Sequence, residues 1–325
     1  MKPIAQADAG ASGNSKHGRR SSRGSAAGAA KVALSLLLPA LSGCLPLVRT
    51  HKVQPPKMPS VVLNADAAEL VSSINTQFDS FQSLRATVEL RASFPAANKV
   101  DVKESPWFPG YILMRKPNDL RVLGLLPVLH TRAFDMASNG ETFKLLIPPK
   151  SKAIVGGNAV TRKSSNPLEN LRPAVFFDSL LLRKIDTNEL VFLTTETRTI
   201  KDPQGKELLA LPDYDLYIVH ARGDNDGQRP IHQLIPARVI HFNRVDLLPI
   251  EEDIYDQNGD IETQVIYGPY QKFGATKYPG SVTIRRPLEQ YEIELTIQKL
   301  QLNQPLTDDQ FELKIPEGVQ VQKLE

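Results

Sequence analysis

Apolar side chains recur at helical spacing near the start of the region that we expect to fold. Within residues 64–84 the apolar positions lie three and four apart, which places them on one face of a helix. These residues are Leu70, Val71, Ile74, Phe78, Phe81 and Leu84. Asn64 or Asp66 stands where the N-cap of this helix is expected. The pattern therefore predicts a helix with one apolar face.

Alternation replaces the helical spacing after residue 84. From Ala86 to Phe94 the even-numbered residues are apolar and the odd-numbered ones are polar, as in a strand with one buried face. Asn139-Gly140 lies between two further runs and predicts a tight hairpin turn. The other predicted strands span residues 110–115, 120–125, 132–137, 142–147, 152–155, 190–200, 214–220, 231–242, 247–255, 261–267, 280–286 and 291–300. Successive hairpins favour an antiparallel sheet in one domain.

A second amphipathic stretch, residues 166–184, interrupts the strands, and Pro173 is expected to start or break a helix there. We therefore predict an α+β, mostly β, fold in which helices cover the concave face of a strongly curved antiparallel sheet. Because two helices cover such a face only in part, the pattern allows an apolar cavity.

The first 43 residues resemble a signal peptide. Residues 16–31 are cationic and rich in small side chains, and residues 32–41 are apolar. Ten helical residues extend only ~15 Å, about half of a hydrocarbon core. Leu41-Ser42-Gly43-Cys44 is similar to the bacterial lipobox, so we expect Cys44, the single cysteine, to be acylated after cleavage. We therefore predict a signal peptide over residues 1–43.

The residues that follow Cys44 suggest a tether. Residues 45–59 contain four prolines, which favour an extended chain. Leu45, in place of an aspartate, favours the outer membrane over the inner membrane. We predict a lipid-anchored tether over residues 44–59 and a folded domain over residues 60–325, facing the periplasm.

Charge argues against a nucleic-acid partner. The chain of 325 residues has a formal net charge of +3, but residues 1–43 hold six basic residues and one acidic residue, a net of +5. The remainder is therefore at 3 − 5 = −2. An exported chain that is close to neutral offers no basic surface for nucleic acid.

Catalytic motifs are missing from the sequence. It contains no GxSxG, HExxH, GxGxxG or Walker-type segment, and a lone cysteine excludes cysteine-type zinc sites. We expect the acidic run 251–253 to form a solvated edge, and Asp213 and Asp215 to share a strand face without a partner. The histidines His220, His232 and His241 are expected to be ordinary strand residues. We therefore predict no enzyme, no metal and no cofactor.

Several segments resemble the LolA/LolB-type lipoprotein carrier superfamily. They are residues 114–121 (MRKPNDLR), Phe134-Asp135, the hairpin 139–143 (NGETF), and residues 302–311 followed by 315–319. The resemblance implies a half-barrel of about eleven antiparallel strands around helices, with an apolar cavity for acyl chains. It also implies lipid or lipoprotein ligands, a membrane contact through Cys44, and a periplasmic carrier protein as a further candidate partner.

The candidate cavity residues are apolar positions on strand and helix faces. They are Leu90, Leu113, Leu123, Phe134, Phe143, Leu145, Phe176 and Leu180. For each residue taken alone, packing in the core is the favoured alternative, and the alternation does not say which face of the sheet is concave. Two other functions stay open: an envelope scaffold that binds proteins, and a hydrolase centred on a histidine.

Overall fold

The computed structural model describes residues 55–95, 101–158, 172–202, 204–223 and 232–324. The compact unit to which they belong runs from Gln54 to Glu325. The predicted signal peptide, Cys44 and the first part of the predicted tether lie outside the described residues. Within the described ranges no helix combines the length and the apolar character needed to cross a membrane.

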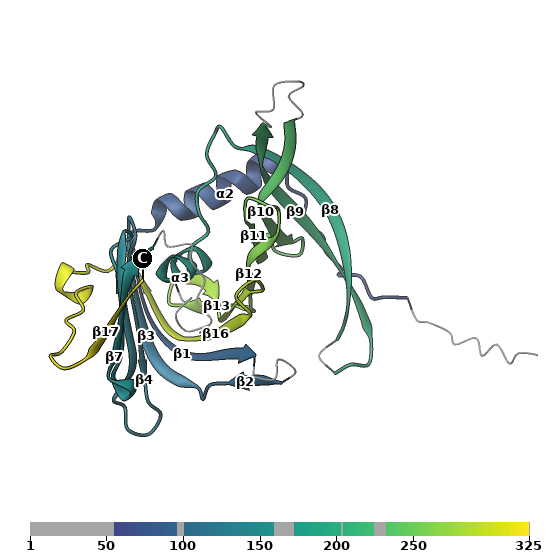
Figure 1. Cartoon of the computed structure of the whole chain (residues 1–325). Helices are drawn as coiled ribbons and strands as arrows, with labels where there is room; N and C mark the ends of the chain where they lie inside the picture. Colours follow the sequence, from purple (N-terminus) through teal and green to yellow (C-terminus); the bar gives the residue numbers. More distant parts are fainter. Residues whose placement is uncertain (1–54, 96–100, 159–171, 203, 224–231, 325) are drawn as a thin grey trace, which may run out of the picture. The chain divides into compact units, whose positions relative to one another are not determined.

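One mixed sheet of 15 strands dominates these residues (Figure 1). Its strands are β1 (Ser83–Pro95), β2 (Val102–Glu104), β3 (Phe108–Arg115), β4 (Asp119–Leu125), β5 (Arg132–Ser138), β6 (Thr142–Ile147), β7 (Lys152–Gly157), β8 (Leu190–Lys201), β9 (Leu208–Gly223), β10 (His232–Asn243), β11 (Leu248–Tyr255), β12 (Ile261–Tyr267), β15 (Ser281–Arg286), β16 (Tyr291–Leu302) and β17 (Gln320–Leu324). A separate hairpin consists of β13 (Tyr270–Phe273) and β14 (Thr276–Pro279).

The sheet consists of two consecutive meanders that meet at its centre. The strand order is β17-β7-β6-β5-β4-β3-β1-β16-β15-β12-β11-β10-β9-β8, with β2 paired to β1. β1 and β16 therefore form a central seam, while β7 and β8, which are consecutive in the chain, lie far apart in the sheet. Between β7 and β8 the chain must pass from one end of the strand order to the other. Helix α3 (Pro173–Leu180) lies on this connection.

Two helices pack against one face of the sheet. Helix α2 (Ala67–Ser80) begins at a capping box, in which Asp66 accepts a hydrogen bond from the Glu69 amide at 2.8 Å and Glu69 accepts one from the Asp66 amide at 3.0 Å. Pro173 occupies the first turn of α3, where its missing N–H has no intrahelical partner to lose. We call the sheet face that packs on these helices the inward face and the opposite one the outward face.

Each face of the sheet carries a hydrophobic cluster. The larger cluster joins α2 and α3 to the inward side chains of both meanders, for example Val88, Ile112 and Ile284. The smaller lies on the outward face of β5–β7, where the segment before β17 covers it; its fully buried members are Ala137, Leu146, Ala153 and Leu313.

The predicted fold class is confirmed, with two differences in detail. The sheet has 15 strands instead of about eleven, and β17 pairs with β7 in parallel. The strands absent from the prediction, β2, β13, β14 and β17, are three to five residues long, too short to show a clear alternation. Helix α2 ends at Ser80 because Leu84 belongs to β1, opposite Met114 of β3.

Candidate functional site

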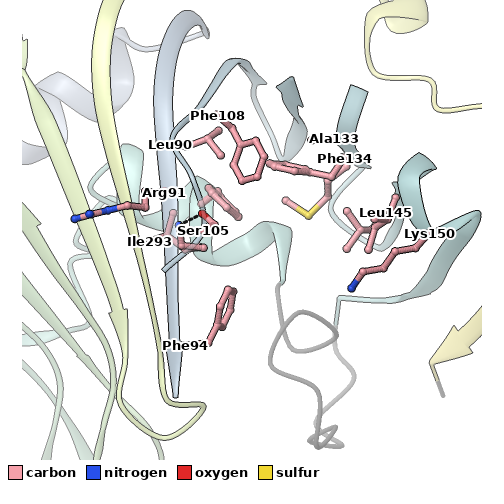
Figure 2. A pocket seen from close by; sticks show the side chains of 14 residues that line it. Leu90, Arg91, Phe94, Ser105, Phe108, Ala133, Phe134, Leu145, Lys150 and Ile293 are labelled. Carbon is pink, nitrogen blue, oxygen red and sulfur yellow. Dashed lines mark hydrogen bonds between the residues drawn. The ribbon is translucent and has the colours of Figure 1, made fainter. Parts of the chain in front are cut away.

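An apolar cavity of about 220 Å³ lies between the first meander and α3. Eleven of its 14 lining residues are apolar. Four aromatic rings contribute, and those of Phe108 and Phe134 meet edge to face with centroids 6.3 Å apart. Figure 2 shows these side chains converging from β1, β3, β5 and β6. The arrangement offers hydrocarbon contacts on several sides.

Four of the eight predicted cavity residues line this space: Leu90, Phe134, Leu145 and Phe176. Phe143 and Leu180 are buried in the inward cluster without lining the cavity.

The remaining two predicted residues, Leu113 and Leu123, are half-buried and lie on the outward face. They do not line this cavity, and their strand neighbours Ile112 and Val122 point inward. Sequence alternation finds such pairs of positions but does not distinguish the two faces.

Lining residues that the prediction missed include Ala92, Phe94, Met136 and Ile293. Ala92 and Phe94 belong to the same run of alternating apolar residues as Leu90, so the sequence pattern places all three on one face of the strand. Ile293 lies opposite Ala92 on β16, and only the long-range pairing of β1 with β16 brings it to the cavity.

Three polar residues reach the cavity lining: Arg91, Ser105 and Lys150. Arg91 is held by Glu104 at 2.8 Å and by Glu294, and its guanidinium lies over the Trp107 ring. Ser105 accepts a hydrogen bond from the Ala92 amide at 2.9 Å. Figure 2 shows Lys150 extending beside Leu145. Hydrocarbon contacts therefore dominate the chemistry of this cavity.

A polar cluster occupies the inward face of the second meander. Glu252 is 1% exposed and lies 3.3 Å from Arg238 Nη1, which also donates to the Arg183 carbonyl. Burial raises the pKa of Glu252 to about 7, although Arg238 favours its charged form. The expectation of a solvated acidic edge was therefore wrong for Glu252. The side chains of β11 alternate between the two faces of the sheet, and that of Glu252 points to the buried inward face.

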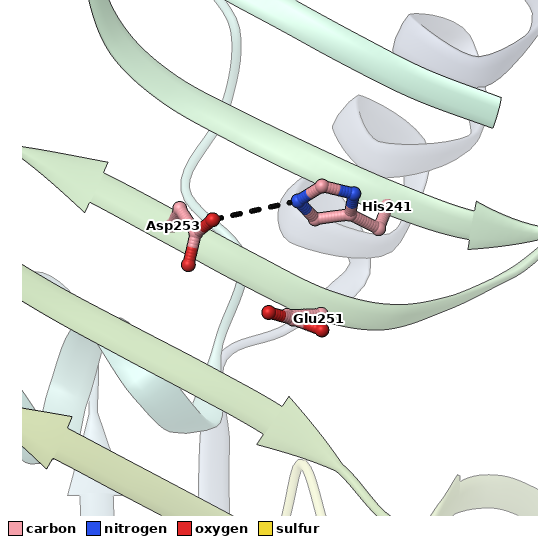
Figure 3. A group of neighbouring side chains, drawn as sticks. All are labelled: His241, Glu251 and Asp253. Carbon is pink, nitrogen blue, oxygen red and sulfur yellow. Dashed lines mark ion pairs between the residues drawn. The ribbon is translucent and has the colours of Figure 1, made fainter. Parts of the chain in front are cut away.

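A second polar cluster lies on the outward face of the same strands. His241 Nδ1 lies 2.8 Å from Asp215 Oδ1, and His241 Nε2 lies 3.5 Å from Asp253 Oδ2 (Figure 3). Burial lowers the pKa of His241, but hydrogen bonds to Asp215 and Asp253 outweigh it and raise the pKa to about 10. Asp253 itself is buried.

Asp213 and Asp215 also have partners, contrary to the prediction. Arg198 Nε donates to Asp213 Oδ2 at 2.6 Å, and burial raises the pKa of Asp213 despite this contact. His241 supplies the partner of Asp215. Both partners come from neighbouring strands, so no local sequence signal reveals them.

The three histidines do not form one site. His220 of β9 lies opposite Ile235, whereas His241 of β10 lies opposite Asp215. Asp215 is five residues from His220 along β9 (220 − 215). The side chain of His232 lies outside the described residues. A catalytic group built from His220 and His241 together is therefore excluded by the register of β9 and β10.

Similar solved structures cover most of the chain. A LolA superfamily protein from Nitrosomonas europaea is similar over 77% of this chain and 99% of its own, with 13% identity and a TM-score of 0.45. A DUF1329 family protein from Desulfovibrio piger is similar over 76% of this chain and 95% of its own, with 13% identity and a TM-score of 0.45. Structures of the LolA superfamily are thus among those similar to this chain.

An outer membrane lipoprotein-sorting domain from Vibrio parahaemolyticus is similar over 76% of this chain and 95% of its own, with 10% identity and a TM-score of 0.40. No protein-family model matches the sequence, and no curated protein matches it significantly.

Proposed function

We propose that this protein is a membrane-anchored lipoprotein of the cell envelope that binds an acyl chain of a lipid or lipoprotein, as a non-enzymatic carrier or receptor. The observation that carries the proposal is the apolar cavity between the first meander and α3. Each methylene that moves from water into such a space contributes about 0.8 kcal/mol. Binding of this kind needs hydrocarbon walls and no catalytic group.

The size of the cavity sets what it can hold. Its volume of about 220 Å³ lies below the roughly 300–1,000 Å³ that is typical of small-molecule sites. It therefore suits a segment of one acyl chain better than a whole lipid. The rest of the ligand would stay outside the cavity.

The lipobox-like segment that ends at Cys44 supports a location at a membrane of the cell envelope. Acylation of Cys44 would tie the domain to a membrane, and the Pro-rich residues 45–59 would separate the two. Replacing Cys44 with serine should release the protein from the membrane fraction and abolish incorporation of a palmitate analogue. Retention of the Cys44→Ser protein in the membrane would contradict the anchor.

Ligand binding is tested by filling the cavity. Ala92 lines it from β1, and the Ala92→Phe ring would occupy the space that we assign to the acyl chain. We expect wild-type protein to carry acyl lipids that mass spectrometry detects, and Ala92→Phe to lower its affinity for a fluorescent fatty acid at least tenfold.

The matched control is Leu113→Phe on the outward face of β3, which should bind the fatty acid as wild type does. Thermal unfolding of both variants verifies that each is folded. A wild-type protein without ligand and without fatty-acid affinity, or equal loss in both variants, would overturn the proposal.

A further inference from the structure

The outward polar cluster of the second meander brings three metal-ligand side chains together. Glu251 lies directly opposite His241 across the β10–β11 pair, and Asp253 follows on the same face of β11. One ligand atom from each residue lies within 4.8 Å of the others. Figure 3 shows His241 and Asp253 directed at each other, with Glu251 nearby. We propose that His241, Glu251 and Asp253 bind a divalent transition metal, with Zn²⁺ as the best-matched ion.

The donor set supports this choice of ion. One imidazole nitrogen and two carboxylate oxygens are ligands that Zn²⁺ accepts, and three protein ligands leave a fourth position for water or another ligand. Two neighbouring strands supply all three residues. Their paired backbones fix the spacing of the ligands more firmly than loops would.

His241 is oriented as a metal ligand. Its Nδ1 lies 2.8 Å from Asp215 Oδ1, so in the neutral ring Nδ1 carries the proton and Nε2 presents its lone pair. The Nε2 atom is buried and faces Asp253 Oδ2 at 3.5 Å, a contact too long for a strong hydrogen bond. A carboxylate behind a histidine in this way is the usual outer support of a zinc-bound imidazole.

The two carboxylates are oriented as well. Gln264 Nε2 donates to Glu251 Oε1 at 2.9 Å and to Asp253 Oδ1 at 3.1 Å. Arg198 Nη1 approaches Glu251 Oε2 at 3.3 Å. Asp253 Oδ2 stays directed at His241. These contacts hold the ligands before any ion arrives, which lowers the entropic cost of binding.

The balance of charge favours a cation at this place. Asp213, Asp215, Glu251 and Asp253 share the outward face of β9 and β11, and Arg198 is the cationic side chain that contacts Asp213 and Glu251. One buried oxygen, Asp213 Oδ1, has no hydrogen-bond partner among the described residues. The competing state is an imidazolium at His241 that pairs with Asp215 and Asp253.

Zinc titration of the mature protein in competition with a chelating dye distinguishes a zinc site from an imidazolium at His241 that pairs with Asp215 and Asp253. We expect one tight Zn²⁺ per chain and at least a tenfold loss of affinity in His241→Ala. Asp215→Asn should cost about 10–100-fold, as removal of an outer partner usually does. His220→Ala, which removes an exposed histidine of β9, should bind Zn²⁺ as wild type does.

X-ray absorption of the zinc-loaded wild type gives an answer that does not depend on variants. We expect one nitrogen and at least two oxygen ligands at about 2.0–2.2 Å. His241→Lys keeps a positive charge near Asp215 and Asp253, so it should preserve thermal stability but lose zinc. Wild type that binds no tighter than His241→Ala, or equal loss in His220→Ala, would overturn the site.

Discussion

Arg238 connects two strands of the second meander to the segment that follows α3 at one buried point. Only 8% of the residue is exposed, and its guanidinium contacts Glu252 as well as the carbonyls of Arg183 and Lys184. The residue therefore pairs with a buried carboxyl and binds the segment that follows α3. Without Arg238, burial would make Glu252 take up a proton, and the two carbonyls would lose their donor.

We expect Arg238→Met to lower the free energy of unfolding by about 1–3 kcal/mol, measured by urea denaturation at pH 7, because buried acceptors lose their donor. Adding Glu252→Gln to Arg238→Met should change this loss little at pH 7, because the Glu252 carboxyl is then protonated, and should reduce the loss at higher pH. The control is Arg285→Met, which breaks an exposed pair with Glu292 on the outward face and should cost less than about 1 kcal/mol. Equal losses in Arg238→Met and Arg285→Met would contradict the role of burial.

Among the elements, α3 joins the two meanders and closes one side of the cavity. Val175, Phe176, Phe177 and Leu180 bury their side chains, and Tyr278 Oη donates to the Leu180 carbonyl at 2.5 Å. Asp178 lies on the same helix, where burial raises its pKa although Arg183 favours its charged form at 2.6 Å. The raised pKa means that the folded protein favours the protonated form of this carboxyl on α3.

The raised pKa of Asp178 predicts how stability changes with pH. The folded protein holds this proton more tightly than the unfolded chain, so the stabilisation is complete below the ordinary value of 3.8 and is lost as pH rises through the folded pKa. We expect the stability of wild type relative to Asp178→Asn to fall as the pH rises above the ordinary carboxyl value of 3.8. Urea unfolding at successive pH values measures this difference.

Arg183→Gln removes the ion pair that favours the charged form of Asp178, so the same decline should move to higher pH. A stability difference that stays constant or increases with pH would contradict the raised pKa.

Most elements could be predicted from the sequence because each meander is local. β6 and β12 match their predicted bounds, and α2 differs only at its ends. The predicted start of β9 is too late, because Pro212 and Asp213 do not resemble strand residues. In the structure Arg198 on β8 pairs with Asp213, so Asp213 can lie in the sheet.

The candidate site could be predicted only in part, because some of its residues come together through the pairing of strands that are distant in sequence. Leu90 and Phe134 follow local alternation, so the sequence identifies them. The position of Ile293 in the cavity lining and the placement of His241 opposite Glu251 depend on the register between strands. Such register is set by the packing of the whole sheet, not by local pattern.

At the scale of the whole molecule, the C-terminal segment completes the first meander. Three cations on the outward face donate to its backbone: Arg115 to the Leu306 carbonyl, Arg121 to the Gln310 carbonyl and Lys144 to the Leu313 carbonyl. Leu313 covers the smaller cluster, and β17 then pairs with β7. The segment therefore protects both an apolar face and a sheet edge.

Ending the chain after Asn303 should lower the free energy of unfolding by more than about 3 kcal/mol, since Leu306 and Leu313 each contribute about 1.5–3 kcal/mol when buried. Association should also increase, because β7 becomes an open edge. Removal of residues 320–325 alone leaves Leu313 in place and should cost less. Urea unfolding and size-exclusion chromatography check both forms, and an unchanged midpoint in the longer truncation would contradict the role of this segment.

The central seam between β1 and β16 has a consequence for how the chain acquires its structure. The Gln82 amide donates to Asn303 Oδ1, across 221 positions of the chain, whereas the hairpins within each meander join neighbours in sequence. Local hairpins close quickly and distant strands pair slowly. The two meanders should therefore form first as separate half-sheets, and the cavity, which needs Ala92 and Ile293 side by side, should arise only in the last step of folding.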